Sequence, residues 1–82
     1  ITRPENARLA ARMRDEMSLK LDLSKNREKL HWDQTTNHYL FARLVQEVEE
    51  LRDAIYNNES ERVWEEAADV ANFAAMLADN NA

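Results

Sequence analysis

The sequence contains no cysteine, no glycine and a single proline, Pro4. Without cysteine, the chain can form neither a disulfide framework nor a thiolate metal site. The tight turns of β-proteins need residues that adopt positive φ, and glycine fills that role most readily, so its absence argues against a turn-rich β-fold. Ala, Leu, Glu and Arg, all good helix formers, are frequent instead. The composition therefore predicts an all-α chain.

Two further absences narrow the class of protein. No apolar run approaches the ~20 residues that a membrane helix needs, and no signal-peptide pattern is present. A net charge of −5 argues against a nucleic-acid partner, because binding DNA or RNA normally requires a basic face. We therefore expect a cytoplasmic protein without membrane or nucleic-acid partners. Its 82 residues, 1–82, are enough for one small domain, which buries only a modest part of its surface alone.

Apolar spacing predicts a first helix from the start of the chain to about Leu23. Thr2 can cap it, and Pro4 falls in the first turn, where proline is tolerated. The apolar stripe of this helix consists of Leu9, Met13 and Met17. Residues 24–34 are polar and mixed, so we expect a connector with at most one helical turn.

The second helix is expected over residues 36–56, capped by Asp33 or Thr35. Its apolar stripe is predicted to consist of Phe41, Leu44, Val48, Leu51 and Ile55, with Glu47 and Glu50 on the flank. After a short turn at residues 57–60, an antiparallel third helix is expected to run to about Asp79, capped by Asn58 or Ser60.

The third helix is apolar around most of its circumference, which is typical of a helix buried on all sides. A chain of three helices cannot easily bury one of them completely. We therefore predict a four-helix-bundle-like core formed through oligomerisation, as a homodimer or homotetramer.

The candidate functional residues of the sequence are two acidic doublets, Glu47-x-x-Glu50 and Glu66-x-x-Asp69. Residues three apart lie on one face of a helix, so each doublet forms a pair of carboxylates. The second doublet shares its sector of the helix with Phe73, Met76 and Leu77. Carboxylates among apolar neighbours are costly to bury unless they are paired or bind a cation, and clustered carboxylates suit a hard divalent metal.

The order and spacing of the doublets resemble those of the MazG-type nucleotide pyrophosphohydrolases, in the all-α NTP pyrophosphatase superfamily. The pattern of that family is EExxE followed further along by ExxD. The similarity covers about residues 40–78 and includes the flanking segments LVQEVEEL at 44–51 and EEAADVAN at 65–72. One departure is visible: Gln46 stands where the family usually has the first Glu of EExxE, which removes one charge beside the site.

The resemblance implies a Mg²⁺-dependent enzyme, with Mn²⁺ as a possible substitute. Such an enzyme hydrolyses a (d)NTP to the (d)NMP and pyrophosphate, in a role of nucleotide-pool house-cleaning. It also implies the catalytic residues and metal ligands, which are Glu47, Glu50, Glu66 and Asp69. One of these four could instead orient the attacking water.

Four more residues are predicted to bind substrate. Lys29 could hold a phosphate and Trp32 could stack on the base, the alternatives being a solvated lysine and a packed tryptophan. Arg43 is either a phosphate ligand or an ion-pair partner of the acids. Asn72 lies on the buried helix and therefore needs hydrogen-bond partners. It could bind the sugar or base of the substrate, or it could form a hydrogen bond across the subunit interface.

Some relatives continue into a further helix that supplies cations, whereas this sequence ends at Ala82. We therefore expect phosphate-binding cations from the connector, the first helix or a neighbouring subunit.

Two alternatives to the enzyme stay open. The first is a non-catalytic helical dimerisation or regulatory module with a vestigial acidic site. The second is a ferritin-like metal carrier, disfavoured because Glu28-x-x-His31 is a single ExxH motif and a di-iron bundle needs two. Pyrophosphate release distinguishes the enzyme from the module, and metal preference distinguishes Mg²⁺ from iron.

Overall fold

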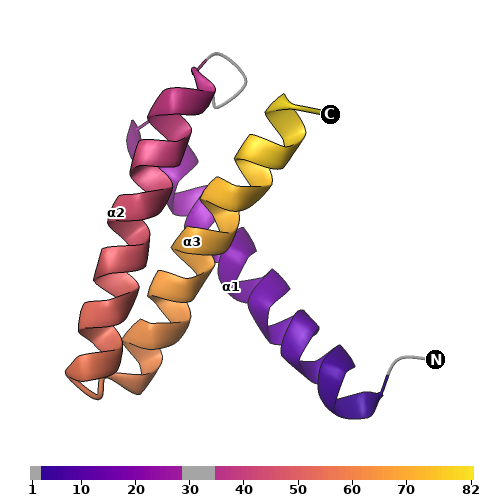
Figure 1. The fold of residues 1–82 in the computed structure, drawn as a ribbon. Coiled ribbons are helices and arrows are strands. Elements are labelled where there is room, and N and C mark those ends of the chain that lie inside the picture. The colour runs from indigo at the N-terminus through magenta and orange to yellow at the C-terminus, as the bar shows by residue number, and fades with distance from the viewer. Residues whose placement is uncertain (1–2, 29–34) are drawn as a thin grey trace.

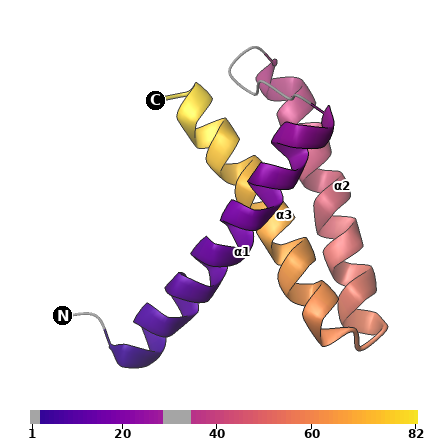
Figure 2. The same ribbon diagram turned by 180° about the vertical axis from the view of Figure 1, so that it is seen from behind.

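The computed structural model describes residues 3–28 and 35–82, which form three helices and, within these ranges, no strand. Helix α1 spans Pro4–Glu28, α2 spans Asn37–Tyr56 and α3 spans Ser60–Asn80. Helices α2 and α3 lie side by side as an antiparallel hairpin, and α1 crosses α3 obliquely (Figures 1 and 2). The prediction of an all-α chain of three packed helices is confirmed. No helix in the described ranges is both long enough and apolar enough to cross a bilayer.

Helix α1 ends later than predicted, at Glu28 rather than near Leu23. Residues 24–28 are polar, but they include neither glycine nor proline, so nothing in them stops a helix that has already formed. The predicted cap at Thr2 and residues 29–34 of the predicted connector lie outside the described residues.

Both predicted caps of the hairpin helices need correction. Thr36 caps α2, because its Oγ1 accepts a hydrogen bond from the backbone N–H of Tyr39 at 3.1 Å. The side chain of Thr36 therefore takes the role that was predicted for Asp33 or Thr35. Glu59 occupies the N-cap position of α3 without a side-chain hydrogen bond, so neither Asn58 nor Ser60 is the cap.

Asn58 instead shapes the turn between α2 and α3, with a positive φ of 56°. The Asn58 N–H donates to the Ile55 carbonyl at 3.2 Å, and the Glu59 N–H donates to the Ala54 carbonyl at 3.1 Å. These two bonds form a Schellman motif, in which asparagine tolerates the left-handed conformation that glycine usually occupies. The chain reverses within a few residues, so the two acidic doublets face each other across the hairpin.

The core lies where the three helices meet. Leu40, Phe73 and Met76 form its buried centre, and three partly buried leucines pack around it: Leu21, Leu44 and Leu77. Helix α2 turns a buried line towards α3 that consists of Leu40, Glu47 and Ala54, two helical turns apart. A carboxylate therefore lies in the middle of the helix–helix contact.

The apolar stripe predicted for α2 is only partly directed inward. Leu44 and Leu51 are half-buried, whereas Phe41, Val48 and Ile55 are 58%, 48% and 53% exposed. With Val45 they form a row on the outside of the hairpin, which we call the outer stripe of α2.

Helix α3 is also less enclosed than its composition indicated, because three alanines face outward, Ala74, Ala75 and Ala78. In the hairpin, the large apolar side chains that remain exposed all belong to α2. The sequence had instead singled out α3 as the helix that needs a partner to bury its apolar surface.

Candidate metal centre

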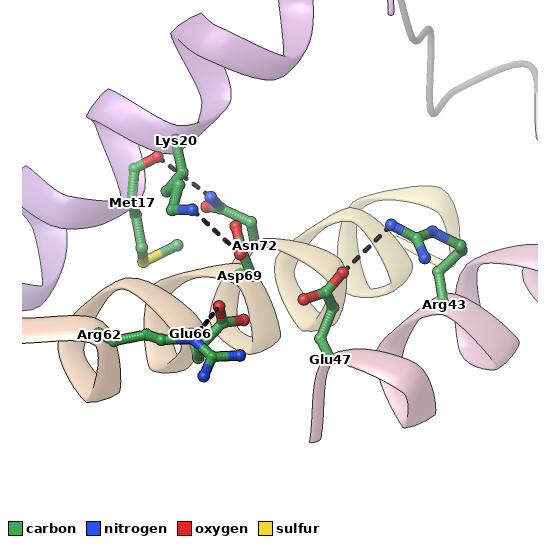
Figure 3. Close-up of polar contacts among 8 residues, drawn as sticks. All are labelled: Met17, Lys20, Arg43, Glu47, Arg62, Glu66, Asp69 and Asn72. Carbon is green, nitrogen blue, oxygen red and sulfur yellow. Dashed lines mark hydrogen bonds and ion pairs between the residues drawn. The ribbon is translucent and has the colours of Figure 1, made fainter. Parts of the chain in front are cut away.

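Three of the four predicted acids come together between α2 and α3. Glu47 from α2 and Glu66 and Asp69 from α3 each offer one carboxylate oxygen, and these oxygens all lie within 4.8 Å of one another (Figure 3). Glu47 is 5% exposed and Glu66 9%, while Asp69 is half-buried. We call these residues the acidic triad. Glu47 reaches it from the buried line of α2, and the turn at Asn58 brings α3 alongside.

Two oxygens of the triad have no partner. Glu47 Oε2 and Glu66 Oε2 are buried and receive no hydrogen bond from any described residue. An unsatisfied buried polar group costs ~1–3 kcal/mol, and more when it is charged. Hard divalent cations take carboxylate oxygens as ligands. The triad therefore has the donor atoms to hold a metal ion.

Glu50, the fourth predicted ligand, is exposed and lies outside the triad. Its carboxylate interacts with those of Glu47 and Glu66, and the first of these interactions is the main reason that its pKa is lowered. Glu50 is thus an ionised acid at the rim of the triad. Its role as a fourth metal ligand stays a prediction.

The triad carboxyls resist ionisation. Burial is the largest cause that raises the pKa of Glu47 to about 7, followed by its contact with Glu50 and the charge of Asp69. Burial and the Glu50 carboxylate likewise raise the pKa of Glu66. Burial raises the pKa of Asp69 although Lys20 lies beside it. All three shifts have the direction expected when acids are desolvated together without enough positive charge.

Each triad carboxylate is paired with one basic side chain. The pairs are Arg43 with Glu47 at 3.1 Å, Lys20 with Asp69 at 3.3 Å and Arg62 with Glu66 at 3.5 Å (Figure 3). Sequence reasoning missed Lys20 and Arg62. The spacing of Arg62 four residues before Glu66 was a usable signal, since such residues are neighbours on a helix. Lys20 gave no such signal, because its place depends on how α1 crosses α3.

Arg43 forms the ion pair that was one of its two predicted roles. Its guanidinium also lies 5.2 Å from the centre of the Phe73 ring and donates a hydrogen bond to Gln46. Gln46, where the family pattern has a glutamate, therefore helps to hold the cation that faces Glu47. A phosphate-binding role for Arg43 stays a prediction.

Asn72 is buried and ties α1 to α3. Its Nδ2 donates to the backbone carbonyl of Met17 at 3.1 Å, while its Oδ1 has no partner among the described residues. The observed bond lies within one chain, and contact with a sugar, a base or a second subunit stays a prediction. Lys29 and Trp32, the other predicted substrate-binding residues, lie outside the described residues.

No protein-family model, curated protein or solved structure matches this chain. The three-helix fold and the acidic triad therefore rest on the structure of this chain alone. The family resemblance of residues 40–78 remains a prediction.

Proposed function

We propose that this protein is a Mg²⁺-dependent nucleoside triphosphate pyrophosphohydrolase that converts a (d)NTP and water to the (d)NMP and pyrophosphate. The observation that carries the proposal is the acidic triad with its two unpartnered buried oxygens. Mg²⁺ prefers oxygen ligands and usually joins one or two carboxylates to substrate phosphates. Mn²⁺ is expected to substitute for it. The order of the two doublets along the chain, which resembles the MazG-type pattern, supports this reaction over other metal chemistry.

In this proposal Glu47, Glu66 and Asp69 hold the metal ion. The bound ion would screen the acids from the substrate phosphates and polarise the phosphorus centre. In this proposal Glu50, which is exposed at the rim of the triad, would accept a hydrogen bond from the attacking water. The buried carboxylates are held in place by their ion pairs, so little reorganisation is needed when charge develops in the transition state.

A screen of canonical and modified dNTPs with Mg²⁺, analysed by ion-exchange chromatography, tests the proposal. We expect the monophosphate and pyrophosphate as products, and neither the diphosphate nor phosphate. A diphosphate product would reject the proposed site of bond cleavage. No turnover with any nucleotide would favour the non-catalytic helical module, and a preference for iron over Mg²⁺ would favour the metal carrier.

We further propose that a second copy of the chain covers the outer stripe of α2, giving a homodimer or a dimer of dimers. Phe41, Val45, Val48 and Ile55 are exposed and follow the alternating spacing of three and four residues that pairs helices. Arg52 continues the row and Glu49 borders it, both exposed. A row with both charges is complementary to itself when two copies run antiparallel, as a twofold interface requires.

Val48→Glu is expected to convert the dimer to a monomer, because it would bring a charge from each copy into the apolar part of the interface. Analytical ultracentrifugation at micromolar concentration measures the change. Ala75→Glu is the matched control, since it adds the same charge on the exposed side of α3. A wild-type protein that sediments as a folded monomer would contradict the proposed interface.

A further inference from the structure

Lys20 differs from the other two cations of the metal centre in where it comes from. Arg43 and Arg62 each pair with an acid four residues away on the same helix, an arrangement that helix geometry produces routinely. Lys20 belongs to α1 and reaches Asp69 on α3, with Nζ 3.3 Å from Oδ2 (Figure 3). Local geometry does not account for this ammonium group, which the crossing of α1 over α3 brings to the triad.

A hydrogen bond holds the backbone near Lys20 against α3, and the Lys20 side chain itself is partly exposed. Met17, one helical turn before Lys20, accepts the hydrogen bond from the buried Asn72, which holds this part of α1 against α3. The Lys20 side chain is 26% exposed, so part of it contacts solvent. Lysine carries a compact charge with three donors on a flexible four-carbon stem. The group can therefore change partners without any movement of the helix.

We propose that Lys20 is a phosphate-binding residue, whose ammonium leaves Asp69 when a divalent cation binds the triad and then binds a phosphate oxygen of the substrate. This inference rests on the proposed function. With Glu50 included, four carboxylates face three cations in the metal-free site, which leaves it one positive charge short. Adding a divalent cation gives the site an excess of positive charge. A released ammonium with access to solvent is then free to bind an anion.

The experiment compares Lys20→Met with wild type in two calorimetric titrations. The first measures Mg²⁺ affinity, and the second measures the affinity of the Mg²⁺-loaded protein for inorganic triphosphate. We expect Lys20→Met to bind triphosphate at least about tenfold more weakly, the scale of one lost hydrogen bond between charged groups. Its Mg²⁺ affinity should be unchanged or higher, because the competing cation on Asp69 is gone.

Two more variants sharpen the comparison. Lys20→Arg keeps the positive charge and should recover most of the triphosphate affinity. Arg14→Met removes an exposed cation from the same helix, one that pairs only with the neighbouring Asp15 among described residues, and should behave as wild type.

Each other outcome overturns the inference in a recognisable way. If Lys20→Met binds triphosphate as wild type does and only melts at lower temperature, Lys20 is a structural tie between α1 and α3, and the proposed function stands. A parallel loss of Mg²⁺ affinity would show that Lys20 supports the triad and not the phosphate. If the wild-type protein with Mg²⁺ does not bind triphosphate at all, the inference is wrong, and the dNTP screen decides the proposed function separately.

Discussion

Glu66→Gln is expected to lower turnover at least ~10²-fold, the scale of loss when a positioned charge acting on the transition state is removed. Glutamine keeps the shape and volume of the side chain, so the buried position should still pack. Glu66 contributes one of the two unpartnered buried oxygens, and an amide is a much weaker ligand for Mg²⁺ than a carboxylate. The measurement is kcat for pyrophosphate release, with circular dichroism to show that the helices remain. Glu47→Gln should behave in the same way.

Glu65→Gln is the internal control for this series. Glu65 is the immediate neighbour of Glu66 but is exposed and outside the triad, so its loss should leave turnover near wild type. Equal losses in Glu65→Gln and Glu66→Gln would show that the triad is not the active centre. Glu50→Gln tests the fourth predicted acid. If Glu50 is a metal ligand, the variant should lose Mg²⁺ affinity together with turnover, and if Glu50 orients the water, it should lose turnover alone.

Mg²⁺ is expected to raise the melting temperature, and to raise it more at pH 8 than at pH 5.5. Without metal, Glu47 has a pKa of about 7 in the folded protein against an ordinary value of 4.5. The folded state therefore holds a proton that the unfolded state has lost, so stability is present at low pH and falls between about pH 4.5 and pH 7. The raised pKa values of Glu66 and Asp69 add to this loss, whereas the lowered pKa of Glu50 acts against it.

Metal binding acts against this loss, because the ligands must be ionised before they can coordinate. At a Mg²⁺ concentration about 100 times Kd, the stabilisation is ~2.7 kcal/mol, which raises Tm by on the order of 10 °C in a domain of this size. Differential scanning calorimetry across pH, with Na⁺ at matched ionic strength as the control, measures both effects.

Glu47→Gln tests the cause of the pH dependence. The variant should melt higher than wild type without metal at pH 8, because the buried charge is gone, and should gain little from Mg²⁺. A wild-type melting curve that Mg²⁺ leaves unchanged at pH 8 would contradict the metal centre itself.

The features of the fold that depend on residues near one another along the chain could be predicted from the sequence. Helix-forming residues and the lack of glycine indicated three helices, and the spacing of Glu66 and Asp69 placed them on one face. The short turn then made it possible to expect that Glu47 would meet them. All of these features depend on residues that are near one another along the chain.

The parts that depend on how helices cross could not be read in this way. On α2, the line through Leu40 and Glu47 and the more apolar line through Phe41 and Val48 are about 100° apart, and periodicity favoured the second. The structure buries the first, with Leu40 in the core beside Phe73 and Met76 and the carboxylate of Glu47 in the acidic triad. Lys20 was missed for a similar reason, since only the docking of α1 on α3 brings it to Asp69.

The connectivity of the three helices also predicts an order of events during folding. Glu47 and Glu66 are joined by a short stretch of chain through the turn at Asn58, so closing the hairpin costs little loop entropy and assembles the triad. Helix α1 packs chiefly against α3, the helix furthest from it in sequence. We therefore expect the acidic triad to assemble with the hairpin, and Lys20 to join it only when α1 packs on α3.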